Sequence, residues 1–161
     1  MNHAYLTSIL DYDPDTGIFT WSTPRPKIRV GQKAGCLHKG KKYVYIEIDG
    51  KGYAAHRLAW FYVTGKMPID QIDHINRNRS DNRFENLREA NNKFNQANRK
   101  TTSKYGLKGI TYHKWLTENP WEAKIRVDKK DIYLGCYPTK EEAHKAYCIA
   151  AEKYFGEFAS H

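Results

Sequence analysis

The chain has 161 residues, of which 40% are hydrophobic and 28% charged, a size for one compact domain or two small ones. Its apolar runs are shorter than the about 20 residues of a membrane helix, and its first residues lack the segments of a signal peptide, so we expect no membrane partner and a cytoplasmic location. Lys and Arg number 27 against 18 Asp and Glu, and this net charge of +9 favours an anionic partner, most often nucleic acid.

The first 68 residues are expected to form a β-rich region. Residues 13–17, Asp-Pro-Asp-Thr-Gly, are a strong turn signal, and the β-formers at residues 18–21 follow directly. The alternating run at residues 43–48 precedes Asp49 and Gly50, a pair that favours a tight hairpin. Two hairpins are therefore predicted in this region.

A basic tract and one helix complete this region. No acidic residue stands between Thr16 and Ile46, which suits either a solvated loop or a tract that follows a phosphate backbone. The cations of this tract are Arg25, Lys27, Arg29, Lys33, Lys39, Lys41 and Lys42. Residues 56–63 are expected to form a short buried helix that ends at Gly65, with His56 as a buried hydrogen-bonding residue.

Asparagine is unusually frequent in the next segment, residues 69–99. Eight asparagines stand between positions 76 and 98: Asn76, Asn78, Asn82, Asn86, Asn91, Asn92, Asn95 and Asn98. Leu87, Ala90, Phe94 and Ala97 have helical spacing and predict a helix across this stretch. Because amides weaken a helix without a packing gain, the segment is expected to hold a site.

After a basic linker at residues 100–106, a second unit is expected at residues 107–159. Three short antiparallel strands, followed by one helix, are predicted at residues 109–113, 121–127, 132–136 and then after Thr139. Thr139 and Glu142 form a capping box, and the apolar stripe of the helix is Ala143, Ala146, Tyr147, Ala150 and Tyr154. Alternation leaves a polar, mostly basic sheet face on the side away from the helix.

The three cysteines, Cys36, Cys136 and Cys148, are widely spaced, with no C-x-x-C pair. This pattern indicates neither a disulfide framework nor a zinc ribbon, and it fits a reducing compartment. Each cysteine is expected to be a small buried apolar residue.

Asp73 and His74 are the centre of the functional argument. They are adjacent on a probable strand, so their side chains should point to opposite faces unless the chain bends. A carboxylate can bind a hard cation and an imidazole can take a proton from water, two roles that phosphodiester hydrolysis requires at one phosphate. A surface pair is the ordinary alternative for an isolated Asp-His dipeptide.

The run from Asp73 to Leu87, D-H-I-N-x-N-x-x-D-N-R-x-E-N-L, followed by Asn95 and Asn98, resembles the HNH motif of phage and intron-associated homing endonucleases. The resemblance implies an α+β fold with a ββα-metal (His-Me finger) core, DNA as substrate, and the host cytoplasm if the protein is phage-encoded. It assigns His74 as general base, Asp73 and Asn95 as ligands of one divalent cation, Mg²⁺ or Mn²⁺, and Asn86 as the residue that braces the loop and orients His74.

Two departures from the family pattern are visible. Asn95 stands where the third letter of the motif is His, and the zinc-binding cysteines of some relatives are missing. The first departure lowers the expected affinity for the metal. The second leaves the small motif to be held together by residues 1–68.

The second unit resembles the plant APETALA/ethylene-response-factor DNA-binding domain. The matching residues include Tyr105 to Ile110, Trp121 to Arg126, Tyr133 to Gly135 and Glu141 to Tyr147. The resemblance places DNA contacts at Lys108, Thr111, His113, Trp115, Lys124, Arg126 and Tyr133. Several arginines of the plant domains are replaced here, so contacts to the DNA backbone are expected more than base readout.

These observations predict a metal-dependent homing endonuclease that nicks or cuts double-stranded DNA, with no small-molecule substrate, targeted by its C-terminal module. The alternative is a sequence-specific DNA-binding regulator whose nuclease motif is vestigial. An RNA-binding accessory protein suits the charge but not the expected metal site. Oligomeric state and protein partners are left open by the sequence.

Overall fold

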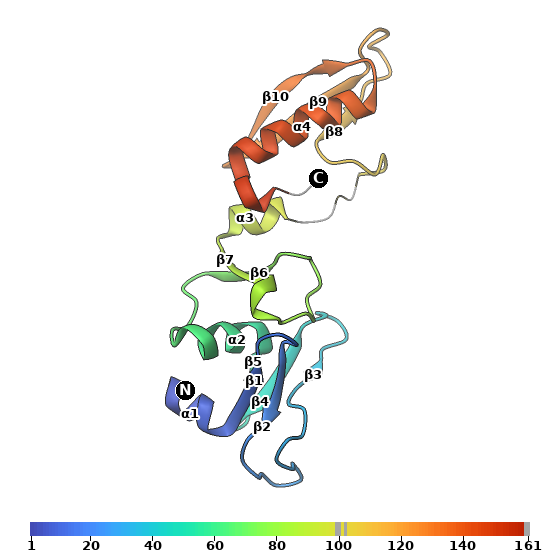
Figure 1. The fold of residues 1–161 in the computed structure, drawn as a ribbon. Helices are drawn as coiled ribbons and strands as arrows, with labels where there is room; N and C mark the ends of the chain where they lie inside the picture. Colours follow the sequence, from blue (N-terminus) through green and yellow to red (C-terminus); the bar gives the residue numbers. More distant parts are fainter. Residues whose placement is uncertain (99–100, 102, 160–161) are drawn as a thin grey trace. The chain divides into compact units, whose positions relative to one another are not determined.

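The computed structural model describes residues 1–98, 101 and 103–159 and divides into two compact units, Met1–Ala90 and Asn91–His161. Both units mix helices with small antiparallel sheets (Figure 1). The boundaries expected from the sequence, at residues 68, 99 and 106, stay predictions, and positions 99, 100 and 102 of the linker region lie outside the described residues. No helix in the described part of the chain is long and apolar enough to cross a membrane.

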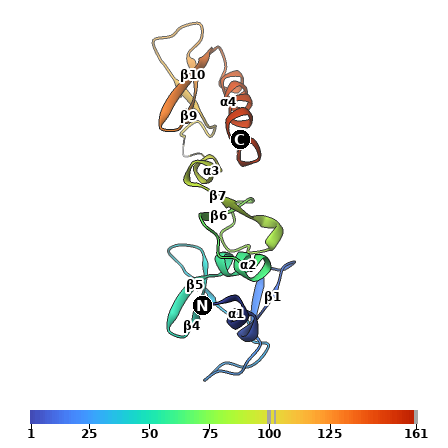
Figure 2. The same cartoon turned by 90° about the vertical axis from the view of Figure 1, so that its left-hand side faces the viewer.

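The first unit contains two helices, a 3₁₀ turn and three small sheets. Its elements are α1 (His3–Ile9), β1 (Leu10–Asp13), β2 (Ile18–Trp21), β3 (Cys36–Leu37), β4 (Val44–Ile48), β5 (Lys51–Ala54), α2 (Ala55–Thr64), β6 (Gln71–His74), η1 (Phe84–Asn86) and β7 (Leu87–Ala90). Strand β1 pairs with β2, β4 lies between β3 and β5, and β6 pairs with β7, all antiparallel. Helix α1 packs beside α2 (Figures 1 and 2).

The sequence predicted several of these elements and missed others. Both expected hairpins are present, and the second turns at Asp49 and Gly50, which have the positive φ angles that a two-residue hairpin turn requires. Helix α2 ends at Gly65, whose left-handed backbone forms the C-cap. Helix α1 was not predicted, although Asn2 caps it by accepting a hydrogen bond from the Tyr5 amide.

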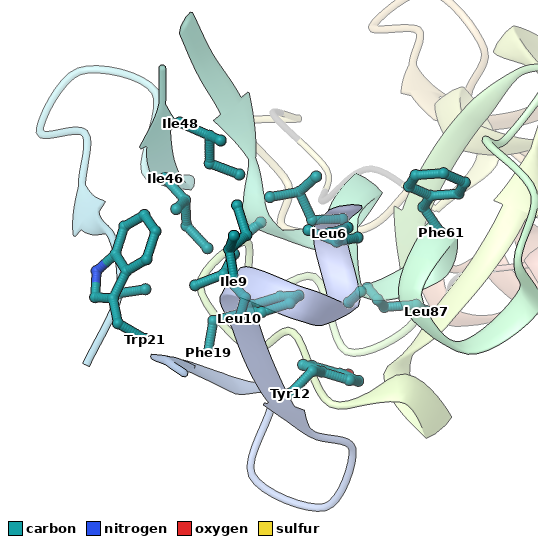
Figure 3. Close-up of a cluster of buried hydrophobic side chains, with 14 of the residues drawn as sticks. Leu6, Ile9, Leu10, Tyr12, Phe19, Trp21, Ile46, Ile48, Phe61 and Leu87 are labelled. Atoms are coloured by element: carbon teal, nitrogen blue, oxygen red, sulfur yellow. The ribbon is translucent and has the colours of Figure 1, made fainter. Parts of the chain in front are cut away.

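The core of the first unit gathers apolar side chains from nearly every element. Leu6 and Leu10 from the N-terminal segment meet Phe19 from β2, Ile46 from β4 and Leu58 from α2, and all are almost fully buried (Figure 3). This core fixes the position of β6 and β7, because Ile72 and Leu87 belong to the same cluster. Apolar packing on residues 1–68 thus contributes to holding this hairpin in place.

The helix predicted across Leu87, Ala90, Phe94 and Ala97 is wrong in its first half. Leu87–Ala90 is strand β7, which pairs with β6, and both of its end residues are buried. The helix α3 (Asn92–Ala97) begins only after Asn91, whose Oδ1 accepts a hydrogen bond from the Phe94 amide. The apolar spacing of this stretch suits a helix, but pairing with β6 makes its first part a strand. The cap by Asn91 then starts the helix after that strand.

The second unit continues with β8 (Ile110–Tyr112), β9 (Trp121–Val127), β10 (Lys130–Tyr137), α4 (Lys140–Phe155) and the 3₁₀ turn η2 (Gly156–Phe158). The three strands form one antiparallel sheet with β9 in the centre, and α4 packs on it (Figure 2). This is the predicted small sheet on one helix, and the Oγ1 of Thr139 accepts from the Glu142 amide as the capping box requires. Phe155 is buried at the end of α4, whereas Tyr154, expected in the apolar stripe, is 36% exposed.

The expectation that the cysteines are buried is wrong. Cys36 is exposed, and Cys136 and Cys148 are partly exposed; all three are free thiols. Cys36 lies on β3, a two-residue strand at the edge of its sheet with both residues exposed, so its side chain meets solvent rather than the core.

Candidate active site

Strand β6 carries the two side chains at the centre of the predicted site. Asp73 is 6% exposed and His74 is 4% exposed, so both are buried although neighbouring residues on a strand point to opposite faces. Strand β7 pairs with β6, and rings from α2 and from the turn before β4 lie next to the His74 ring. Asp73 and His74 are therefore both enclosed within the first unit.

His74 has a defined hydrogen-bond partner in Asn82. The Nε2 of His74 lies 3.3 Å from the Oδ1 of Asn82, and Asn82 is itself 2% exposed. An amide oxygen only accepts hydrogen bonds, so Nε2 carries the ring proton and Nδ1 carries the lone pair. Burial lowers the pKa of His74 below its usual value, which keeps the ring neutral and able to accept a proton.

The β1–β2 hairpin contacts the backbone of Asn82. The hydroxyl of Tyr12 donates to the Asn82 carbonyl oxygen over 2.7 Å, and the Phe84 amide donates to the carbonyl of Pro14 over 3.1 Å. Gly17, at φ +71°, lies so close that a Cβ there would stand 2.4 Å from the carbonyl carbon of Asn82. The β1–β2 hairpin therefore packs against the backbone of Asn82 and sets the position of its side-chain amide next to His74.

A second histidine and a tyrosine surround the His74 ring. His56 from α2 lies 5.1 Å from it between ring centroids, and Tyr43 lies 5.9 Å from it and 4.9 Å from His56. His56 is buried as expected, but its Nδ1 has no hydrogen-bond partner among the described residues. Burial, with His74 and Arg57 as further causes, lowers the pKa of His56 to about 3, so this ring is neutral.

Asp73 forms an ion pair that the sequence did not reveal. Its Oδ2 accepts hydrogen bonds from Nε and Nη2 of Arg88, at 3.1 and 3.0 Å, and both side chains are largely buried. The two residues face each other in the register of β6 and β7. Arg88 stands fifteen positions after Asp73 in the sequence, so its contact with Asp73 can be predicted only when the register of β6 and β7 is known.

Asn86 ties together both ends of the loop between β6 and η1. Its Oδ1 accepts from the Asn76 amide over 2.9 Å, and its Nδ2 donates to the Asp81 carbonyl over 2.8 Å. The Ile75 amide also donates to the Asn86 carbonyl. This geometry is that of a loop brace, and Asn82 is a direct hydrogen-bond partner of the His74 ring.

Asp81 is the remaining carboxylate of this loop, and its charge is already compensated. Arg83 donates to it from Nε and Nη2, and Asn76 donates from Nδ2 over 2.7 Å. The hydrogen bonds from Arg83 lower the pKa of Asp81 to about 2, so it is ionised and engaged. We therefore assign it to loop structure.

Asn95, the second predicted metal ligand, lies on α3 in the second unit and is partly buried. Its convergence with Asp73, and with it the ββα-metal arrangement, stays a prediction. Asn98, the other asparagine that follows the motif, is 5% exposed in the same unit.

The predicted DNA contacts of the second unit fall into two groups. Trp115, Lys124, Arg126 and Tyr133 are exposed, and Tyr133 pairs with Lys124 across β9 and β10, on the face away from α4. Lys108, Thr111 and His113 are half-buried; the ammonium group of Lys108 donates to the Ala97 carbonyl over 2.7 Å, and His113 contacts Glu122 at 2.5 Å. The exposed group is thus the part of the prediction that is open to a partner.

Two comparisons with known proteins concern this region of the chain. Residues 53–97 match the HNH endonuclease family, a segment that includes His56, Asp73, His74, Asn82 and Asn86. The chain is 32% identical over 123 residues to an uncharacterized HNH endonuclease of Acanthamoeba polyphaga mimivirus. The match covers 75% of this chain and spans 63% of the length of that relative. Residues 53–97, the segment from β5 to α3, are thus similar to HNH endonuclease domains.

Proposed function

We propose that this chain is a metal-dependent DNA endonuclease of the homing type, in which His74 is the general base. The observation that carries the proposal is a buried, neutral histidine whose Nε2 is hydrogen-bonded to Asn82, next to a buried aspartate, inside the HNH segment. A neutral histidine that donates from one ring nitrogen can accept a proton at the other.

The proton transfer follows from the tautomer of His74. Its Nδ1 accepts a proton from a water molecule while the water oxygen attacks phosphorus. The bond from phosphorus to the 3′ oxygen breaks, and the leaving oxygen takes up a proton from solvent. Asn82 keeps the ring in the required tautomer, and Asn86 keeps the loop that carries Asn82 in place.

HNH nucleases generally use a divalent metal ion, and the donor types of this chain fit one. The Asp73 carboxylate and the Asn95 amide offer hard oxygen atoms, which favour Mg²⁺ or Mn²⁺ over Zn²⁺. The described residues contain no group of three His, Cys, Asp or Glu side chains that could hold a metal. When bound, such an ion would neutralise charge on the phosphate and on the leaving oxygen.

Arg88 has a defined part in this proposal. Through Oδ2 it fixes the orientation of the Asp73 carboxylate and compensates its charge in a buried position. A cation that binds Asp73 must share the carboxylate with this guanidinium group. Arg88 is therefore a positioning residue for the ligand rather than a group that touches the phosphate.

We further propose that the open sheet face of the second unit docks on duplex DNA and directs the nuclease to its target. The exposed side chains of Trp115, Lys124, Arg126 and Tyr133 support this, since they combine positive charge with aromatic surface. Removing Lys124 and Arg126 together should weaken binding across all sequences and lower its salt dependence. Unchanged binding would contradict this role.

Cleavage of supercoiled plasmid tests the enzymatic proposal. The chain should convert it to the nicked form with Mg²⁺ or Mn²⁺ and not with EDTA, because a monomer with one metal centre attacks one strand. His74→Ala should lower the rate by about 10²–10⁴-fold and keep DNA binding. His144→Ala, a histidine on α4, is the matched control and should cleave normally. Equal binding without cleavage by any form, over several metals and DNAs, would indicate a DNA-binding regulator instead.

A further inference from the structure

Two turns of the first unit bring five cations to the neighbourhood of His74. The turn at residues 38–43, between β3 and β4, carries three lysines, and the loop after β6 carries two arginines. We call this set the Tyr43 surface: Lys39, Lys41, Lys42, Arg77 and Arg79, all exposed, on the two turns that meet at Tyr43. Figure 1 shows the cyan turn reaching the green loop that follows β6.

Direct contacts join the two turns to each other and to the site. Nη1 of Arg79 donates to the Lys41 carbonyl over 3.4 Å, and the guanidinium carbon lies 5.1 Å from the centre of the Tyr43 ring. The same ring lies 5.9 Å from that of His74 and 4.9 Å from that of His56. The Tyr43 ring thus contacts both the exposed guanidinium group of Arg79 and the two buried histidines.

Both turns have a fixed backbone. The His38 amide donates to the Tyr43 carbonyl and the Lys42 amide to the His38 carbonyl, each over 2.8 Å. The Arg77 amide donates to the carbonyl of His74, also over 2.8 Å, so this arginine is anchored to the strand end that carries the base. The cations are therefore presented at defined positions rather than on a loose chain.

The positive charge of this surface is not compensated within the unit. None of its five cations forms an ion pair with a carboxylate in the described part of the chain. The nearby acids are already engaged, since Asp73 pairs with Arg88, and both Asp81 and Glu85 pair with Arg83. A cluster of this kind attracts a polyanion and releases counterions when it binds one.

We propose that the Tyr43 surface binds the phosphate backbone of duplex DNA and seats a phosphodiester in front of His74. This inference rests on the proposed nuclease function and adds to it a DNA-binding surface in the same unit as the base. The second unit would then select the target, while the Tyr43 surface would hold the strand that is cut.

Binding can be measured without cleavage by using the full chain with His74→Ala in EDTA. Fluorescence anisotropy of a labelled 30-base-pair duplex, recorded at several salt concentrations, gives the affinity and its salt slope. The test variant combines Lys39→Gln, Lys42→Gln and Arg77→Gln, three exposed side chains that leave the Arg79–Tyr43 contact in place. Its salt slope should fall by about 2–3 units, close to 0.9 for each phosphate that the variant no longer neutralises.

The matched control removes the same charge from the loop between β2 and β3, at the other end of the unit from β6 (Figures 1 and 2). It combines Lys27→Gln, Arg29→Gln and Lys33→Gln, all exposed. The control slope should fall by less than about 1 unit. An equal decrease in both variants would overturn the proposal, because general electrostatics would then explain the binding.

Two further arms keep the result unambiguous. A charge-retaining variant combines Lys39→Arg, Lys42→Arg and Arg77→Lys and should bind DNA like the unaltered chain. Weak binding by this variant would overturn the assignment to charge. Tighter binding to duplex RNA than to DNA of the same sequence would overturn the choice of DNA. If the unaltered chain does not cleave DNA, the nuclease function fails, while the binding comparison still decides whether this surface holds a phosphate backbone.

Discussion

The two units of the chain bury different kinds of side chain. Of the six buried polar or charged residues among those described, five lie in the first unit: His56, Asp73, His74, Asn82 and Asn86. In the second unit the sheet and α4 meet through Ile110, Ala123 and Ala143, and the charged side chains of β9 point away from this core. Buried polar groups need partners at fixed positions, so the geometry around His74 and the stability of the first unit are coupled.

Among the variants that test this coupling, Gly17→Ala should have the largest effect on the free energy of unfolding. At φ +71° a side chain is strained, and the new Cβ would stand 2.4 Å from backbone atoms of Asn82 and Arg83. We expect a decrease of about 3 kcal/mol in the free energy of unfolding, measured with urea, together with reduced cleavage because Asn82 must move. Gly31→Ala is the control, since Gly31 has φ +78° but nothing within 4 Å, and should cost about 1 kcal/mol. Similar decreases for both variants would contradict the close approach.

Asn82→Ala should act on the chemistry more directly. Without the amide oxygen, the His74 ring loses the hydrogen bond that fixes its tautomer, and we expect the cleavage rate to fall by about 10²-fold. The ¹⁵N chemical shifts of His74 should show a protonated Nε2 in the unaltered chain and a mixture of tautomers in the variant. The control is Asn78→Ala, an exposed asparagine of the same loop. A protonated Nδ1 in the unaltered chain would contradict the orientation of Asn82.

The same contrast explains which features could be predicted from the sequence. The alternation of β9 and the cap of α4 depend on residues within a few positions of one another, and both were predicted. Asp73 and His74 were singled out because they stand in a recognisable motif. Arg88 and Asn82 could not be assigned roles, because these depend on the register of β6 with β7 and on the hairpin that positions the amide.

Leu87 and Ala90 show the limit of periodicity most clearly. Their spacing suits one face of a helix, but the two residues are the buried ends of a four-residue strand. A burial pattern of this length is compatible with both structures, and the pairing with β6 decides between them. The contact of Asn82 with the His74 ring also depends on tertiary structure. The sequence therefore showed Asn82 only as one of eight asparagines in this segment.

The pH dependence of stability should also separate the units. Because the pKa of His56 is lowered to about 3, the unfolded chain binds a proton between about pH 6.5 and 3 that the folded chain does not. The stabilisation by neutral His56 is present above pH 6.5 and is lost as the pH falls. The free energy of unfolding should decrease by about 1 kcal/mol between pH 6.5 and 5.5, and by about 1.4 kcal/mol between pH 5.5 and 4.5.

His56→Phe isolates this contribution. Its unfolding free energy should fall less steeply between pH 6.5 and 4.5 than that of the unaltered chain, because Phe has no proton to take up. Urea unfolding at several pH values measures the difference. Parallel curves for the two proteins would show that His56 is charged or accessible in the folded state.

The smallest expected effect concerns a polar group of the second unit. Thr139→Ala removes the cap of α4 and should cost about 1 kcal/mol, whereas Thr139→Ser keeps the hydroxyl and should cost much less. Hydrogen exchange in the first turn of α4 measures the effect locally. The His74 ¹⁵N shifts should stay unchanged, because the cap acts on one helix end and has no part in the network of the first unit. A change in those shifts would mean that the two units are coupled through more than the chain that joins them.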